Sequence, residues 1–287
     1  MKLARDIKKL MVLAAFCCPL IWGEPLLAQD LDISPPEPDA YQPFVLTFSV
    51  CYMPEDPAHV DIYMSADSIT VKATDVDITC SLVEKVARIA GLPGGSYSIK
   101  RGSYLIENND YAEDPSPEVL GSVSVGPAPP AVRVYAFYNS ESHHYFVTGS
   151  TAERDSLESG GGGGGWMIVD KGFDAWPADG PAPDAAKPVC RFYSAAVNSH
   201  FYTAGPNECE LLKQPSSGWT YEGIAFRALV PTQGSCYPGT TPVWRLYNDR
   251  FAQADSNHRF VTSADTYRHM IANGWIGEGV AFCSPES

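Results

Sequence analysis

Three histidines in the second half of the chain, His144, His200 and His258, are the residues best suited to chemistry. Each opens a short segment that contains aromatic residues and threonine. Three imidazoles that meet on a common axis would form a metal site of the type that zinc uses. Identical residues at repeated places more often perform one structural task three times. We therefore expect a structural role first and contact with a ligand second, with no metal and no other cofactor.

Four polar residues near these segments are further candidates for ligand binding. They are Asn139, Asn248, Asp249 and Asn257. Aromatic side chains of the same region, such as Tyr193 and Trp219, offer faces on which a sugar ring stacks, although most aromatic residues of a small domain belong to its core. A glycan or another cell-surface ligand is the ligand class that this combination favours.

Arginine and glutamate occur together in two of three similar segments. The two pairs are Arg191 with Glu222 and Arg245 with Glu278. The first segment replaces both members, with Ala136 and Lys171. Loss of one member of a buried ion pair leaves an uncompensated charge, whereas loss of both is tolerated. We predict that each pair is a structural salt bridge within its own segment.

Catalytic arrangements are weakly represented. Glu222 and Glu278 have the residue type of a glycosidase pair, but such carboxylates must face one cleft, about 5 to 9.5 Å apart. Ser156, Ser194 and Ser217 lack a Gly-x-Ser-x-Gly setting. We predict no catalytic residue and a protein that is not an enzyme. The alternative is a secreted hydrolase, or the remnant of one, that acts on polysaccharide or peptidoglycan.

Residues 133–287 repeat one pattern three times. The opening strands read Val134-Tyr-Ala-Phe-Tyr-Asn, Val189-Cys-Arg-Phe-Tyr-Ser and Val243-Trp-Arg-Leu-Tyr-Asn, and the histidine segments follow them. Trp219-Thr-Tyr-Glu-Gly-Ile-Ala-Phe and Trp275-Ile-Gly-Glu-Gly-Val-Ala-Phe close the later copies. The copies span about 133–176, 188–230 and 242–283, and each predicts two strands, a short helix and two further strands. One copy alone cannot bury both faces of its strands, so a shared aromatic core is expected. The predicted fold is mainly β, pseudo-threefold and β-trefoil-like.

Helix-start signals recur in the three copies. Ser150 and Glu153 have the spacing of a capping box. A glycine precedes Pro206, which suits the first helical position. Ser263 is a good N-cap for the third helix.

The first copy is the most diverged. It has lost the Arg–Glu pair and gained a glycine run from Gly160 to Gly165. That run carries no Lys-Ser/Thr and follows no strand, so it predicts a flexible spacer and not a phosphate loop. A ligand site added to one face is expected at this copy.

The three strand blocks together resemble a repeat of unknown function in exported bacterial proteins. Its signature is an Arg-Phe-Tyr-Asn strand, a His-Phe-Tyr-Thr strand and a Tyr-Glu-Gly-Ile-Ala-Phe strand. The resemblance covers residues 133–283 and implies an accessory role without a catalytic residue. It also implies the disulfides Cys190–Cys209 and Cys236–Cys283, which sequence spacing alone does not fix.

Residues 29–126 predict a separate β domain. Short alternating strands separated by turns, in about 95 residues, favour a β-sandwich. The stretch from Gly91 to Ile99 resembles the late hairpin of bacterial immunoglobulin-like domains, with Tyr97 as its anchored tyrosine. A Cys51–Cys80 bridge is expected, and the acidic loop 108–118 is expected to be solvated because it lacks the spacing of a calcium loop. Residues 127–132, rich in proline and alanine, predict a stiff linker.

Residues 1–28 predict an export signal. Basic residues precede an apolar run from Leu10 to Trp22, which is too short to span a membrane. A lipoprotein that uses Cys17 is the less favoured alternative. Of eight cysteines, six follow this segment, and an even number in an exported chain favours disulfides.

The formal net charge of −14 makes nucleic acid a poor partner. We expect a secreted or periplasmic protein that does not insert into a membrane. Its expected function is that of a non-catalytic binding or accessory module, with a structural cell-envelope protein as a second alternative.

Overall fold

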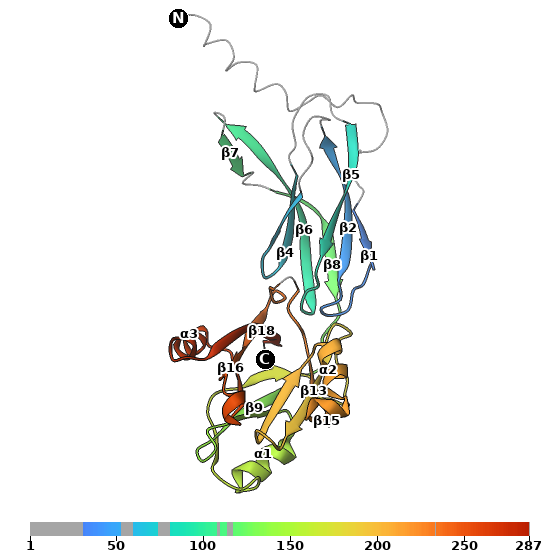
Figure 1. Cartoon of the computed structure of the whole chain (residues 1–287). Coiled ribbons are helices and arrows are strands. Elements are labelled where there is room, and N and C mark those ends of the chain that lie inside the picture. The colour runs from blue at the N-terminus through green and yellow to red at the C-terminus, as the bar shows by residue number, and fades with distance from the viewer. Residues whose placement is uncertain are drawn as a thin grey trace, which may run out of the picture. The chain divides into compact units, whose positions relative to one another are not determined.

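The computed structural model describes residues 31–52, 60–73, 81–107, 110–113, 117–232 and 234–286 (Figure 1). As predicted, the fold is mainly β, with three short α-helices in the described residues. None of the helices in these residues is long and apolar enough to cross a membrane. The predicted export signal lies outside the described residues.

The chain forms two compact units. Of the described residues, the N-terminal unit takes in those up to Pro38 and those within Phe44–Ile89 and Gly95–Ser124. The C-terminal unit takes in those within Asp39–Pro43, Ala90–Gly94 and Val125–Ser287.

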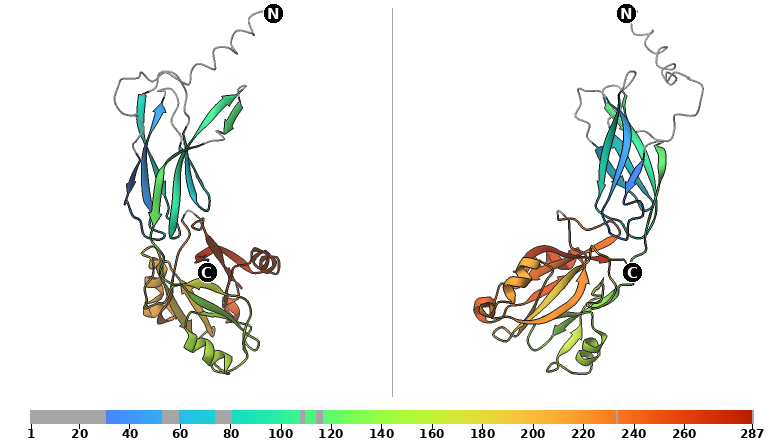
Figure 2. Two further views of the ribbon diagram at one scale, coloured as in Figure 1. Left: turned by 180° about the vertical axis from the view of Figure 1, so that it is seen from behind. Right: turned by 90° about the vertical axis from the view of Figure 1, so that its right-hand side faces the viewer.

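The N-terminal unit contains two β-sheets, which form separate layers in Figure 2. The first sheet has the order β1-β2-β5, and the second has the order β3-β4-β6-β7 with β8 paired to β6. The strands are β1 (Asp32–Ser34), β2 (Phe44–Tyr52), β3 (Val60–Met64), β4 (Ser68–Ala73), β5 (Ser81–Ile89), β6 (Gly95–Glu107), β7 (Asp110–Glu113) and β8 (Glu118–Val125).

Alternating residues of both sheets are buried, so the core lies between the layers. Phe44, Leu46 and Phe48 of β2 are almost fully buried, as are Ile69 of β4 and Ile99 of β6.

Three sequence predictions fall in this unit. Tyr97, predicted to be anchored, is 6% exposed. The expected acidic loop is in part strand β7, which pairs with β6, because a hairpin satisfies its backbone groups. The side chains of the predicted Cys51–Cys80 bridge lie outside the described residues.

The C-terminal unit contains three small antiparallel sheets, one in each of three subdomains. The first subdomain has β9 (Val132–Asn139), β10 (Tyr145–Thr148), α1 (Thr151–Glu158), β11 (Trp166–Ile168) and β12 (Phe173–Ala175). The second has β13 (Lys187–Ser194), β14 (Ser199–Thr203), α2 (Pro206–Leu212) and β15 (Thr220–Ala228). The third has β16 (Thr240–Tyr247), β17 (His258–Val261), α3 (Ala264–Ala272) and β18 (Ile276–Pro285).

The opening strand of each subdomain is the centre of its sheet. The second strand pairs on one side and the closing strand on the other, with the orders β10-β9-β11, β14-β13-β15 and β17-β16-β18. The expected fourth strand is separate in the first subdomain, where it is β12. In the other two subdomains it is the continuation of a single bulged strand, β15 or β18.

The subdomains meet at a shared aromatic core. Phe173 of β12, Phe226 of β15 and Phe282 of β18 form a triangle with ring-centroid distances of 5.6, 5.6 and 6.0 Å. Between subdomains, strand pairing in the described part of the chain is limited to single bridges such as Leu229–Cys283. The continuous ladder of a trefoil barrel is therefore not formed by these strands.

The helices begin where the sequence predicts. The hydroxyls of Ser150 and Ser263 accept hydrogen bonds from backbone amides at the starts of α1 and α3. Pro206 occupies the first turn of α2. The capping box of α1 is half formed, because the Glu153 carboxylate is turned toward Arg191 of the next subdomain.

Two disulfides cross-link the C-terminal unit. Cys190 is bonded to Cys209, and Cys236 is bonded to Cys283. These are the two pairs that the family resemblance implied. The first ties β13 to α2 within one subdomain, and the second ties the loop before β16 to β18.

Candidate functional site

Strand register decides which residues are equivalent in the three subdomains. The equivalent pairs are Tyr138 with Tyr145, Tyr193 with His200, and Tyr247 with His258. Tyr145, and not His144, therefore occupies the place of His200 and His258. The alignment of the three segments by sequence was therefore shifted by one residue in the first segment, where two histidines precede the strand.

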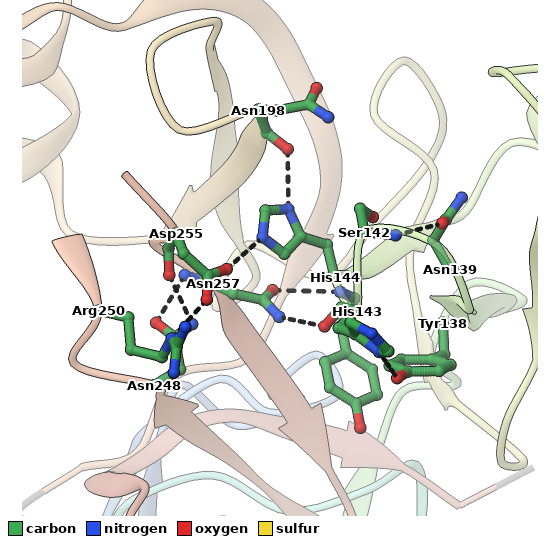
Figure 3. A network of polar contacts seen from close by, with 11 residues as sticks. Tyr138, Asn139, Ser142, His143, His144, Asn198, Asn248, Arg250, Asp255 and Asn257 are labelled. Atoms are coloured by element: carbon green, nitrogen blue, oxygen red, sulfur yellow. Dashed lines mark hydrogen bonds and ion pairs between the residues drawn. The ribbon is translucent and has the colours of Figure 1, made fainter. Parts of the chain in front are cut away.

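His144 joins all three subdomains (Figure 3). Its Nδ1 lies 2.9 Å from the Asn198 carbonyl of the second subdomain, and its Nε2 lies 2.7 Å from Asp255 Oδ1 of the third. The residue is 6% exposed. Both ring nitrogens are thus engaged within the protein, which gives His144 a structural role.

Asn257 performs a similar task at the same contact (Figure 3). Its amide Nδ2 donates to the His143 carbonyl at 3.1 Å, and its Oδ1 accepts from the Tyr145 amide at 3.1 Å. Asn248 in turn holds the loop before β17, because its Oδ1 accepts from the Asn257 amide at 2.9 Å. Asn257 is 1% exposed, so these two predicted ligand residues hold the loops together. Asp249 is exposed, with a φ of 53°.

The seam between the first and second subdomains, here called the first seam, contains a charged triad. Arg191 Nε donates to Glu222 at 2.9 Å, as the predicted pair requires. Nη1 and Nη2 of Arg191 donate to the two oxygens of Glu153, each at 2.9 Å. Glu153 lies in α1, so Arg191 joins two subdomains in addition to pairing within its own.

The triad perturbs the ionisation of its members. Burial alone would raise the pKa of Glu153, but hydrogen bonds from Arg191 and Thr148 leave that pKa below its usual value. Burial alone would lower the pKa of Arg191, but the Glu153 carboxylate raises it. Both groups are therefore held in their charged forms.

A looser version of this triad lies at the second seam, which is the contact between the second and third subdomains. Arg245 Nε lies 2.9 Å from Glu278, and its Nη1 lies 3.9 Å from Glu208 in α2. Glu153 and Glu208 both occupy the third position of their helices.

The seam between the third and first subdomains lacks this triad. Thr266 and Ala136 occupy the places of the helix glutamate and the strand arginine. Arg259 contributes a cation here instead. Its guanidinium lies over the Tyr145 ring, 4.5 Å from the centroid, and 3.7 Å from Asp170.

His200 lies beside the first triad as a neutral imidazole. Burial, and then the positive charge of Arg191, lower its pKa from 6.5 to about 4. Its ring makes an edge contact with Phe146 of the first subdomain at 4.8 Å. His258 makes the equivalent edge contact at the second seam, where its ring centroid lies 4.9 Å from that of Phe201. Burial, and then the positive charge of Arg245, lower the pKa of His258 to about 3. The three predicted histidines therefore lie at separate contacts, and the described residues hold no metal-binding group of three ligands.

An open cleft of about 570 Å³ lies at the first seam. Five of the predicted residues line it: Asn139, His144, His200 and the paired Arg191 and Glu222. His258, Asn248, Asp249 and Asn257 are not among the residues that line it. Tyr193, which the sequence offered as a face for a sugar ring, also lines the cleft. Sequence reasoning missed other lining residues, among them Glu141, Phe146, Glu153, Trp166 and Asn198.

The glycine run forms one wall of the cleft. Gly163 and Gly164 have φ values of +90° and +83°, which only glycine adopts readily. The loop is held in place because Asn139 Nδ2 donates to the Gly164 carbonyl at 2.7 Å. The indole of Trp166 donates to the Gly162 carbonyl at 3.2 Å. The run is thus a shaped loop with internal contacts, and not only the spacer that the sequence suggested.

Glu222 and Glu278 do not face one another across this cleft. Glu278 lines a separate depression of about 400 Å³ at the second seam, together with Glu208 and Arg245. The glycosidase pair considered from the sequence is therefore divided between two sites.

Comparison with known families gives a match in the second half of the chain. Residues 133–285 match a domain of unknown function, DUF5648, which covers more than half of the chain. The chain belongs to this family. The DUF5648 domain coincides with the three subdomains and contains the whole cleft. No curated protein and no solved structure matches the chain.

Proposed function

We propose that the protein is a non-catalytic binding module that holds a glycan in the cleft at the first seam. The observation that carries this proposal is the composition of the cleft. Half-buried Trp166 and Tyr193 offer aromatic surface, and Asn139 and Asn198 are amides beside it. A concave site with aromatic walls and a few polar groups suits a sugar ring.

The proposal extends to the architecture. We regard the three subdomains as copies of one repeat that has diverged at its seams, so that the first seam acquired the glycine loop. The N-terminal β unit then serves as an immunoglobulin-like spacer, and residues 1–28 direct export to the periplasm or the cell exterior.

Binding is favoured over hydrolysis by the state of the carboxylates. A general acid needs a carboxyl group with a raised pKa. Glu153 has a lowered pKa and shares Arg191 with Glu222. Both carboxylates are therefore better suited to fixing the seam than to donating a proton.

A glycan array with the mature full-length chain tests the proposal. Trp166→Ala should abolish binding to the glycans that the wild-type protein retains. Trp219→Ala is the matched control, because Trp219 opens the closing segment of the second subdomain and packs against Phe201, and neither residue lines the cleft. Ser156→Trp, at an exposed position of the cleft wall, blocks the site without removing a core residue.

Three results would overturn the proposal. A blank array would favour the structural envelope protein. Release of shortened sugars from a bound glycan would favour the hydrolase. Undiminished binding by folded Trp166→Ala and Ser156→Trp would place the ligand elsewhere.

A further inference from the structure

The charge balance of the cleft narrows the ligand class. Among the described residues that line the cleft, three are carboxylates, Glu141, Glu153 and Glu222, whereas Arg191 is the single lysine or arginine. His200 is neutral near pH 7 because its pKa is lowered to about 4. His144 lies 2.7 Å from the carboxylate of Asp255. The lining is thus negative overall.

Arg191 is already committed to protein groups. Its Nε, Nη1 and Nη2 all donate to Glu153 or Glu222, and its guanidinium lies over the Phe146 ring at 5.6 Å. A ligand carboxylate, sulfate or phosphate would have to displace one of these partners to reach it. Anionic sugars are therefore poor ligands for this cleft.

Glu141 differs from the other two carboxylates. It is exposed at the rim of the cleft, and none of the ion pairs found among the described residues includes its carboxylate. Its backbone amide donates to Asn139 Oδ1 at 2.9 Å, which fixes the start of the turn that carries it. The charge of Glu141 is therefore available to a ligand.

A second feature points to a polar occupant. Ser199 lines the cleft and is 2% exposed, and its hydroxyl has no hydrogen-bond partner among the described residues. A buried hydroxyl without a partner is uncommon in a folded protein. It can be satisfied by a donor or acceptor that enters the cleft.

We propose that the cleft recognises an amine-bearing sugar, with the ammonium group at Glu141 and the ring against Trp166. This rests on the proposed function, because it names the class of glycan that the cleft would hold. Aromatic faces also attract ammonium groups, so Trp166 and Glu141 favour the same ligand. An acetyl group on the nitrogen removes the charge, and an acidic sugar reverses it.

Titration of the full-length chain with three tetrasaccharides tests the proposal. The probes are β-1,4-linked glucosamine, the same oligomer fully N-acetylated, and oligogalacturonate, in low salt at mildly acidic pH, where the amine is protonated and His200 is still neutral. We expect the glucosamine oligomer to bind most tightly and galacturonate not at all. Glu141→Gln should weaken glucosamine binding about 3- to 5-fold, as expected for an exposed ion pair, and leave any binding of the acetylated oligomer unchanged.

Glu158→Gln is the matched control. Glu158 is an exposed carboxylate of α1 that does not line the cleft, so its loss should not change binding. Equal or tighter binding of the acetylated oligomer, any binding of galacturonate, or equal effects of the two substitutions would overturn the inference. A cleft that binds other glycans on the array but none of the amine-bearing ones would also overturn it, and the proposed function would stand. An array on which the protein binds no glycan would overturn both the proposed function and this inference.

Discussion

Replacement of Arg191 with methionine removes the guanidinium that holds Glu153 and Glu222 together across the first seam. Removal of one partner from a fully buried ion pair costs about 3–5 kcal/mol. Here the side chains of Glu153 and Glu222 are 37% and 29% exposed, so water reduces the repulsion that is left behind. We expect Arg191→Met to lower the free energy of unfolding by about 2 kcal/mol.

Urea denaturation followed by tryptophan fluorescence measures this loss. Once the predicted signal is removed, the remaining tryptophans all lie in the DUF5648 domain, so their emission reports its unfolding alone. They are Trp166, Trp176, Trp219, Trp244 and Trp275.

A triple variant, Arg191→Met with Glu153→Gln and Glu222→Gln, is the critical control. Without the two carboxylates there is no charge to compensate, so this variant should lie within about 1 kcal/mol of the wild type. Arg245→Met should cost less than Arg191→Met, because its helix glutamate is 3.9 Å away. A cost below about 0.5 kcal/mol for Arg191→Met, or a triple variant less stable than the single one, would refute the reasoning.

Two further predictions concern the other seams and pH. The pKa values of His200 and His258 are about 4 and 3, against 6.5 when unfolded, so the unfolded chain binds more protons between these values. The free energy of unfolding should be constant above pH 6.5 and fall by about 2 kcal/mol per histidine by pH 5. His200→Gln and His258→Gln should each flatten this pH dependence, and an unchanged dependence in both variants would contradict the prediction. Asn257→Ala leaves the His143 carbonyl and the Tyr145 amide without their partner and should cost about 2 kcal/mol. Asp249→Asn should be neutral in the same denaturation assay, and equal costs for the two would show that the Asn257 contacts do not stabilise the seam.

Features that depend on neighbours in the sequence were predictable. Ser150 and Ser263 cap their helices because an N-cap involves only the next three residues. The Arg191–Glu222 pair could also be predicted, because the first of the three similar segments lacks both members, as expected for residues that interact. Alternating apolar residues indicated strands such as β2 correctly.

The functional assignments of the histidines and asparagines were less predictable. An extra histidine before β10 shifts the apparent alignment by one residue, and only the strand register shows that Tyr145 corresponds to His200. A polar residue reads the same in the sequence whether it meets a ligand or a backbone carbonyl. Asn257 meets backbone groups more than a hundred residues away in the sequence.

The sequence by itself determined the mainly β content and the helix starts. Each of these follows from residues within a few positions of one another. The tertiary structure alone decided that Glu153 leaves its own helix cap to bind Arg191, and that the glycine run lines the same cleft as His200. The seams are built by residues of different subdomains, and their contacts depend on how three sheets pack around Phe173, Phe226 and Phe282. Packing of that kind is set by the shape of the whole core, which no local pattern specifies.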